Sequence, residues 1–281
     1  MKFENIRVMN FENALRGMRN PKESWHLSDS QFGFCQEDKY NDILSECVTK
    51  HCEFQEIDIE NQYEIYDALC KQMEKSVCIY KDDNLIEYAA IGPKDMELAQ
   101  KLIRAGGEHR KFLRQIFVSV DITAPLYWWK EADTYKVGTV ANSTSTMHKI
   151  DSKPITLDCF EIDDYCKDGL HVINDEPIAD CSLQNFVNNT IQYLEHLRQK
   201  YLETKDKRYW KELIRWLPEG WLQTRTYTLS YETLLAMCSK GQRRSHKLNE
   251  WSGIDDESLE NFIKMARSLP YASQFLFIDE Q

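Results

Sequence analysis

The sequence predicts an α+β fold, and three observations support this class. Residues 116 to 122 alternate between apolar and polar side chains, which is the period of a half-buried strand. Residues 183 to 201 carry apolar side chains at the spacing of an amphipathic helix. The chain has 281 residues, 42% of them hydrophobic and 29% charged, so it can bury a sizeable core like an ordinary globular protein.

Apolar spacing and turn residues place the first elements. Ile65, Leu69 and Met73 fall on one face of a helix expected over residues 63 to 73, whereas residues 3 to 18 show no clean period. Two aspartates and an asparagine then form a turn signal. A β-hairpin around this turn is expected, with strands at residues 77 to 80 and 85 to 91.

A glycine and a proline break the pattern before the next helix. Asp95 is the expected N-cap of a helix over residues 96 to 105, and Gly106 and Gly107 are expected to end it. The alternating strand follows and stops at Pro125. Further helices are expected over residues 126–133, 183–201, 210–217, 231–237 and 257–269, and a further strand over residues 224–229.

Residues 138 to 147 (GTVANSTSTM) are small, polar and rich in hydroxyl groups. This stretch has too few apolar side chains for a core element, so a loop is expected. It lies close in sequence to Lys136 and to the pair Trp128 and Trp129, which suggests a ligand surface. An ordinary solvated loop is the alternative.

Composition excludes several function classes. A net charge of -11 argues against binding to duplex nucleic acid, which relies on Lys and Arg to neutralise phosphates. No apolar run is long enough to cross a membrane and no signal segment is present, so a soluble cytoplasmic protein with reduced thiols is expected. Cys47, His51 and Cys52 lie close together, but no second pair completes a zinc site, and no metal is expected.

Three segments, taken in chain order, form a larger pattern. The first runs from Glu108 and His109 through the alternating strand to Pro125. The second covers residues 134 to 148, and the third runs from Leu217-Pro218 past Thr224-Arg225 to the stretch 244–251 (RSHKLNEW).

These segments resemble the flavin-dependent thymidylate synthases, also called thymidylate synthase-complementing proteins. The family signature is Arg-His-Arg-x-x-Ser-x-Asn-Glu-x-Ser-x-Arg-Tyr. With Ala141 as a one-residue insertion, Asn142 and Ser145 match it, while Lys136 and Thr139 are conservative replacements. The third segment resembles a Ser-His-Ala-Gln-x-Glu run of the family through Ser245, His246 and Glu250.

The resemblance implies a thymidylate synthase-complementing-like fold, a mixed sheet packed with helices, over residues 96 to 281. Residues 1 to 95 would be an N-terminal extension of unknown role. The implied activity is reductive methylation of dUMP to dTMP with FAD as cofactor and with methylenetetrahydrofolate and NADPH as co-substrates. The family site lies between subunits, so a homo-oligomer, in particular a homotetramer, is expected.

The resemblance also implies site residues, although it assigns no catalytic residue. Cofactor contacts would come from Lys136, His109, Thr139, His246 and Asn142. Substrate contacts would come from Ser143, Ser145, Arg225, Arg243, Arg244 and Trp129.

Two departures from the signature leave other functions open. Met147 stands where the family has an arginine for its nucleotide, and Thr134-Tyr135 replaces Arg-His at the flavin. Each lost charge-assisted hydrogen bond to a phosphate costs about 1.5 to 3 kcal/mol. One alternative is therefore a diverged, non-catalytic protein that binds pyrimidine nucleotides on the same scaffold. An oligomeric interaction protein without a nucleotide ligand is another.

Overall fold

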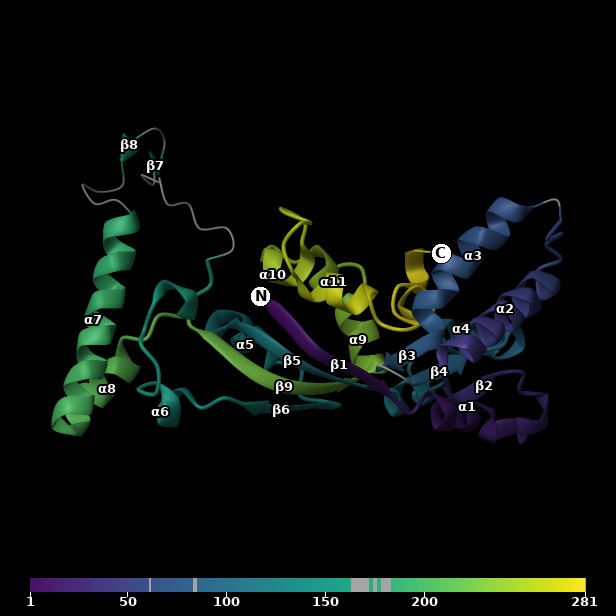
Figure 1. Ribbon diagram of the computed structural model, residues 1–281, viewed down its shortest axis with the longest axis horizontal. Coiled ribbons are helices and arrows are strands. Elements are labelled where there is room, and N and C mark those ends of the chain that lie inside the picture. The colour runs from purple at the N-terminus through teal and green to yellow at the C-terminus, as the bar shows by residue number, and fades with distance from the viewer. Residues whose placement is uncertain (61, 83–84, 163–171, 174–175, 178–182, 281) are drawn as a thin grey trace. The chain divides into compact units, whose positions relative to one another are not determined.

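A computed structural model describes residues 1–60, 62–82, 85–162, 172–173, 176–177 and 183–280. Helices and sheets occur together in it, which confirms the predicted α+β class (Figure 1). Three sheets lie within the described residues, with strand orders β1-β5-β9-β6, β2-β4-β3 and β7-β8. Among these residues, no helix combines the length and the apolar character that a membrane span requires.

The chain divides into two compact units, and each is described separately. Unit 1 consists of Met1–Lys2, Ile122–Thr134 and Ala141–Thr226. Unit 2 consists of Phe3–Asp121, Tyr135–Val140 and Tyr227–Gln281. Residues on both sides of position 95 belong to unit 2, so a separate role for residues 1 to 95 stays a prediction.

The three-stranded sheet of unit 2 contains the predicted hairpin. Strands β3 (Cys78–Lys81) and β4 (Ile86–Ala90) pair antiparallel, as expected. Strand β2 (Gln31–Cys35), which the sequence did not predict, pairs antiparallel with β4 on its other side.

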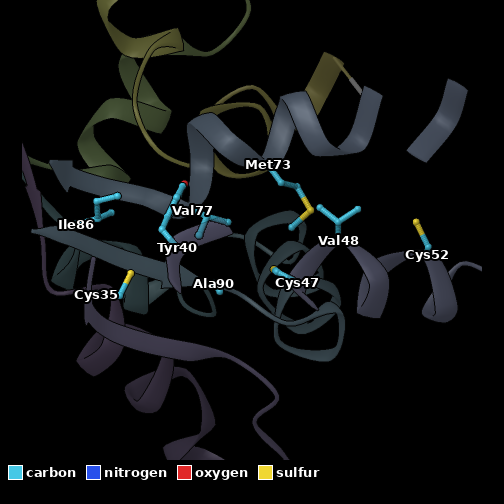
Figure 2. Close-up of a cluster of buried hydrophobic side chains, with 9 residues drawn as sticks. All are labelled: Cys35, Tyr40, Cys47, Val48, Cys52, Met73, Val77, Ile86 and Ala90. Atoms are coloured by element: carbon cyan, nitrogen blue, oxygen red, sulfur yellow. The ribbon is translucent and has the colours of Figure 1, made fainter. Parts of the chain in front are cut away.

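Two helices cover one face of this sheet. Helix α3 (Tyr63–Val77) confirms the predicted helix and extends beyond it, and helix α2 (Glu37–Phe54) was not predicted. Their apolar side chains and those of the sheet form one buried cluster (Figure 2). Its members are Cys35, Tyr40, Cys47, Val48, Cys52, Met73, Val77, Ile86 and Ala90.

Helix α2 explains the Cys-His-Cys stretch. Cys47 and Cys52 are buried in the cluster, and burial raises the pKa of the Cys47 thiol to about 12. The Nε2 atom of His51 lies 3.0 Å from the carbonyl oxygen of Ile91. These side chains therefore pack and hydrogen-bond within the core. Nowhere in the described part of the chain do three potential metal ligands gather.

Helix α4 (Pro93–Arg104) begins differently from the prediction. Its N-cap is Gly92, and Asp95 lies in the first turn, because Pro93 occupies the first helical position. The side chain of Asp29 accepts hydrogen bonds from the backbone N–H groups of Lys94 (3.0 Å) and Asp95 (3.1 Å). Asp95 itself is buried and pairs with Arg19 at 2.6 Å.

The four-stranded sheet contains the alternating strand. Strand β5 (Phe117–Pro125) buries Val118, Val120, Ile122 and Ala124 on one face, which confirms the predicted alternation. It lies between β1 (Lys2–Met9) and β9 (Leu222–Ser230), and β6 (Thr139–Ser143) completes the sheet at its other edge. Strand β9 was predicted, whereas β1 was not.

Two helices of unit 1 lie side by side, α7 (Leu183–Thr204) and α8 (Lys207–Arg215) (Figure 1). Leu194 and Leu197 of α7 pack with Leu213 of α8 in a small buried cluster. The helical spacing of residues 183 to 201 also places Phe186 on the apolar face, but 64% of its surface is exposed. Helix α8 begins before the predicted position because Asp206 caps it, accepting a hydrogen bond from the N–H of Arg208.

The remaining helices are short. The helix expected over residues 257 to 269 begins only after Asn261, whose side chain accepts a hydrogen bond from the N–H of Lys264 at 2.8 Å and so caps it. This helix is α11 (Phe262–Arg267). The other α-helices within the described residues are α1 (Phe11–Arg19), α5 (Leu126–Ala132), α6 (Thr146–Lys149), α9 (Tyr231–Cys238), α10 (Asn249–Ser252) and α12 (Ala272–Phe275).

Candidate functional site

A polar network in unit 1 surrounds Arg225 and is called the Arg225 cluster. Its members are Trp129, Asp133, Thr144, Gln223 and Arg225. Trp129 lies on α5 and Asp133 directly follows that helix. Thr144 directly follows β6, and Gln223 and Arg225 lie on β9. The cluster thus joins the second and third sequence segments.

Gln223 connects this cluster. Its carbonyl oxygen accepts a hydrogen bond from Nε1 of Trp129 at 2.9 Å, and its side-chain oxygen accepts one from Nε of Arg225 at 2.9 Å. Its Nε2 atom donates to the carbonyl oxygen of Thr144 at 2.7 Å. Because Gln223 is buried, these hydrogen bonds hold Arg225 in one position.

The charge of Arg225 is balanced on one side and shielded on another. Nη1 donates to Oδ1 of Asp133 at 2.8 Å, and the guanidinium lies 4.3 Å from the centre of the Trp129 ring. The Arg225 side chain is 15% exposed and that of Asp133 is 55% exposed. Within the described residues, Arg225 donates from Nε and Nη1, so Nη2 has donor capacity that these partners do not use.

The two tryptophans are both buried. Trp129 is 1% exposed and Trp128 is fully buried, and the two rings meet edge to face with centroids 4.8 Å apart. Trp129 therefore supports Arg225 in this structure and presents no open face to a ligand ring. A ring-stacking role for Trp129 stays a prediction that would require its surroundings to move.

The polar stretch over residues 138 to 147 is not a loop throughout. It contains strand β6 and the start of helix α6. An edge strand needs backbone hydrogen bonds on one side only, so it can form with exposed side chains. Asn142 and Ser143 are exposed, Val140 is 66% exposed, and Ser145 caps α6 by accepting a hydrogen bond from the N–H of His148 at 3.0 Å.

A turn in unit 2 carries Lys136. Gly138 has φ of 72°, and a Cβ at this position would lie 3.0 Å from Oγ1 of Thr233. The Thr233 hydroxyl also donates to the carbonyl oxygen of Val137 at 3.2 Å, and Thr139 donates its hydroxyl to the carbonyl oxygen of Tyr135. The turn is therefore held by hydrogen bonds and by the space that a glycine leaves.

Lys136 itself is exposed. It forms no ion pair with any other residue that the structure describes, so its ammonium group can bind an anionic ligand without first breaking an ion pair with a carboxylate.

A second aromatic and cationic group, the Arg243 cluster, lies in unit 2. Its members are Tyr135, Arg243, His246 and Trp251. The guanidinium of Arg243 lies 5.1 Å from the Tyr135 ring centre and 4.5 Å from that of Trp251, and its Nε donates to the Tyr135 hydroxyl at 3.0 Å. His246 meets Trp251 edge to face, with centroids 6.2 Å apart.

Arg244, His246 and His109 all belong to unit 2. Arg244 pairs with both Asp279 and Glu280, and so is bound within unit 2. Nδ1 of His246 accepts a hydrogen bond from the N–H of Leu248 at 3.1 Å. His109 is exposed after helix α4, close to the ion pairs that Arg110 and Arg114 make with Glu232. Their expected roles in binding FAD or a nucleotide stay predictions.

Sequence reasoning missed the residues that support the two arginines. Asp133, Gln223 and Tyr135 each hold an arginine, yet none was a candidate. Gln223 could have been found, because positions two apart on a strand point to the same face and Arg225 was already a candidate. Asp133 and Tyr135 carry no such signal, because only the fold brings them to their partners.

Comparisons with known proteins gave structural likenesses only. No protein-family model and no curated protein sequence matches the chain. A structure of flavin-dependent thymidylate synthase ThyX from Helicobacter pylori, complexed with FAD and dUMP, is similar with a TM-score of 0.45 and 15% identity, over 88% of this chain and 96% of that one. A second structure of this Helicobacter pylori protein with FAD and dUMP gives the same TM-score and identity over 90% and 98% of the two chains. A UMP/dUMP methylase, PolB, from Streptomyces cacaoi is similar with a TM-score of 0.41 and 10% identity, over 65% and 84%.

Proposed function

We propose that this chain binds FAD and a pyrimidine deoxynucleotide and methylates dUMP to dTMP, with methylenetetrahydrofolate and NADPH as co-substrates. The three ordered segments of the sequence motivate the proposal. The observation that carries it is the Arg225 cluster, in which Thr144 of the signature segment and Arg225 of the third segment are joined through Gln223. Hydrogen bonds through Gln223 thus connect the second and third segments of the resemblance within unit 1, next to the candidate Arg225.

The chemistry of Arg225 suits a phosphate. Its guanidinium lies against Trp129, and its position is fixed by Gln223 and Asp133. A fixed planar cation with an available Nη2 can donate to a phosphate oxygen with little loss of side-chain freedom. Asp133 is more than half exposed, so it can move aside or share the guanidinium when a dianion binds.

The residues around Lys136 suit the phosphate-bearing part of a cofactor. Lys136 offers a cation without a carboxylate partner in the described structure, and Thr139 follows it in unit 2 with a hydroxyl group. Bound FAD would supply the transfer of reducing equivalents. The chain would bind and orient the ligands, because the resemblance implies no enzyme nucleophile.

A second candidate function is nucleotide binding without catalysis. Two features of the structure favour it. Tyr135, which replaces a signature histidine, holds Arg243, and Arg244 is already neutralised by Asp279 and Glu280. Fewer cations would then be available for two phosphate-bearing ligands at once.

Titration of the purified protein with FAD tests the proposal and separates the candidates. Binding is followed by the absorbance and fluorescence of the flavin. Lys136→Ala is expected to weaken FAD binding about tenfold, since it removes one charge-assisted contact. Lys22→Ala provides the matched control, because Lys22 is also an exposed lysine of unit 2.

The outcomes are distinct. Uptake of FAD together with formation of dTMP supports the enzyme. Binding of dUMP without any uptake of FAD supports the non-catalytic candidate. A protein that binds neither ligand would overturn both proposals.

A further inference from the structure

A cavity of about 380 Å³, with both polar and apolar lining residues, lies in unit 2 between α3 and the residues from the end of α11 to Phe277. It is called the Lys75 groove. Lys71, Gln72, Lys75 and Ser76 line it from α3, where positions one turn apart share a face. Arg267 and Ser273 line it from the opposite side. None of the residues considered for FAD or dUMP lines this groove.

The charge of the groove is opposite to that of the chain. Three lysine and arginine side chains line it and no aspartate or glutamate does, although the whole chain has 46 acidic and 35 basic residues. Lys71 and Lys75 lie four residues apart on one helix face, where like charges destabilise a helix slightly. An anion between these cations would remove that repulsion.

The carboxylates that pair with these cations lie outside the lining. Lys71 pairs with Asp67 at 2.6 Å, and its side chain is 75% exposed, so this pair is weak. Arg267 donates two hydrogen bonds of 2.8 Å to Glu280 and lies 4.0 Å from the centre of the Phe277 ring. Lys75 forms no ion pair with any residue in the described ranges. Arg267 is therefore a fixed cation on one wall, and Lys75 on the α3 wall is a cation without a carboxylate partner in the described ranges.

Neutral donors complete the groove. Ser76 is buried, and its hydroxyl donates a hydrogen bond to the carbonyl oxygen of Gln72 at 3.3 Å. Nε2 of Gln72 donates across the groove to the hydroxyl of Ser273 at 3.4 Å. Both are long hydrogen bonds that a better acceptor can replace. Hydroxyl, amide and ammonium donors on two facing walls match the several oxygen atoms of a phosphate.

We propose that the Lys75 groove binds the phosphate or pyrophosphate group of a small molecule. Lys75 has no carboxylate partner in the described ranges, and Lys71 and Arg267 keep N–H donors beyond those used in their pairs with Asp67 and Glu280, so the groove suits an anion with several oxygen atoms. Its volume leaves room for more than one phosphate. This site goes beyond the proposed nucleotide chemistry, because it is built from α3 and the C-terminal residues of unit 2.

Isothermal titration of the full chain with inorganic phosphate and with pyrophosphate tests the proposal. Pyrophosphate is expected to bind more tightly than phosphate, and both should bind more weakly at high salt. Lys75→Ala is expected to weaken pyrophosphate binding about tenfold, the usual effect of losing one charge-assisted contact. The matched control is Lys39→Ala, since Lys39 is an exposed lysine of unit 2 outside the groove.

The variant Arg225→Met separates this site from the proposed nucleotide site. Pyrophosphate binding that survives Arg225→Met but not Lys75→Ala supports the groove, whatever the result with FAD or dUMP. The absence of binding by either anion would overturn the proposal. So would a pyrophosphate affinity that Lys75→Ala leaves unchanged, or that Lys39→Ala reduces equally.

Discussion

Glu195 on α7 holds a loop of unit 1 to its helix, and its replacement by glutamine should have a measurable cost. Oε2 of Glu195 accepts hydrogen bonds from the N–H of Ile155 at 2.8 Å and from Nε of Arg198 at 2.7 Å. Oε1 accepts from Nη2 of Arg198 at 2.7 Å and from Gln199 at 3.0 Å. Arg198 in turn donates to the carbonyl oxygen of Asp151 at 3.0 Å.

The pKa of Glu195 sets the size of this cost. The hydrogen bonds from Arg198, followed by those from Ile155 and Gln199, lower its pKa from 4.5 to about 2. At 1.36 kcal/mol per pKa unit, this shift corresponds to about 3 kcal/mol of stability at neutral pH. The Glu195 side chain is 20% exposed, which reduces the expected value to about 2 kcal/mol.

The sign of the pH dependence follows from the lowered pKa. The folded carboxyl keeps its charge at pH values where the unfolded one is protonated, so the stabilisation is complete above about pH 4.5 and is lost as the pH falls towards 2. Urea unfolding of Glu195→Gln, followed by tryptophan fluorescence, should therefore show a cost of about 2 kcal/mol at pH 7 and a smaller cost at pH 3.

Glu203→Gln is the control on the same helix. Glu203 pairs with Lys200 but is 66% exposed, so this substitution should change stability by less than about 0.5 kcal/mol. Equal costs for Glu195→Gln at the two pH values, or no cost at pH 7, would refute the reasoning.

Three further predictions follow from the packing, the backbone and the family resemblance. Leu213→Ala should lower the free energy of unfolding by about 2 to 5 kcal/mol, because Leu213 is fully buried. Leu202→Ala, at a 37% exposed position of α7, should lower it much less, and urea unfolding of the two variants measures the difference. Gly138→Ala should lower the free energy of unfolding by about 1 kcal/mol and weaken FAD binding, because φ is 72° and the new Cβ would crowd Thr233. An unchanged melting temperature together with an unchanged FAD affinity would show that the turn adapts. Light scattering at micromolar concentration should give the mass of a homotetramer, and a monomer would contradict the expectation taken from the family resemblance.

The elements that the sequence predicted well have strong local signals. The alternation of β5 records which side faces the core. The helical spacing of α3 does so for Leu69 and Met73, whereas Ile65 is 46% exposed. Strand β9 and helix α9 (Tyr231–Cys238) were placed within two residues, and in the structure Ser230 separates them as the N-cap of α9.

The missed elements lack such signals. Strand β1 has only Val8 among its residues fully buried, so no alternation shows in the sequence. Strand β6 forms at a sheet edge with exposed side chains, where backbone pairing and not apolar content decides the structure. The start of α4 was misjudged because Asp29, which lies 66 residues before Asp95, takes the capping role.

The candidate site was predictable in its residue types but not in its pairings. The sequence indicated Arg225, Arg243 and Arg244 as possible phosphate ligands. In the structure, Arg225 lies against a tryptophan and an aspartate, Arg243 lies against two aromatic rings, and Arg244 pairs with two carboxylates. These surroundings depend on contacts between distant segments. The sequence contains no local pattern that distinguishes the three arginines.

Titration of the FAD-equilibrated protein with dUMP tests the central claim most directly. The account predicts saturable binding of dUMP that Arg225→Met weakens by tenfold or more, since the substitution removes a charge-assisted contact to phosphate. Arg208→Met is the control, because Arg208 is an exposed arginine of unit 1 that pairs with the nearby Asp206. An absence of heat at millimolar dUMP, or an affinity that Arg225→Met leaves unchanged, would contradict the account.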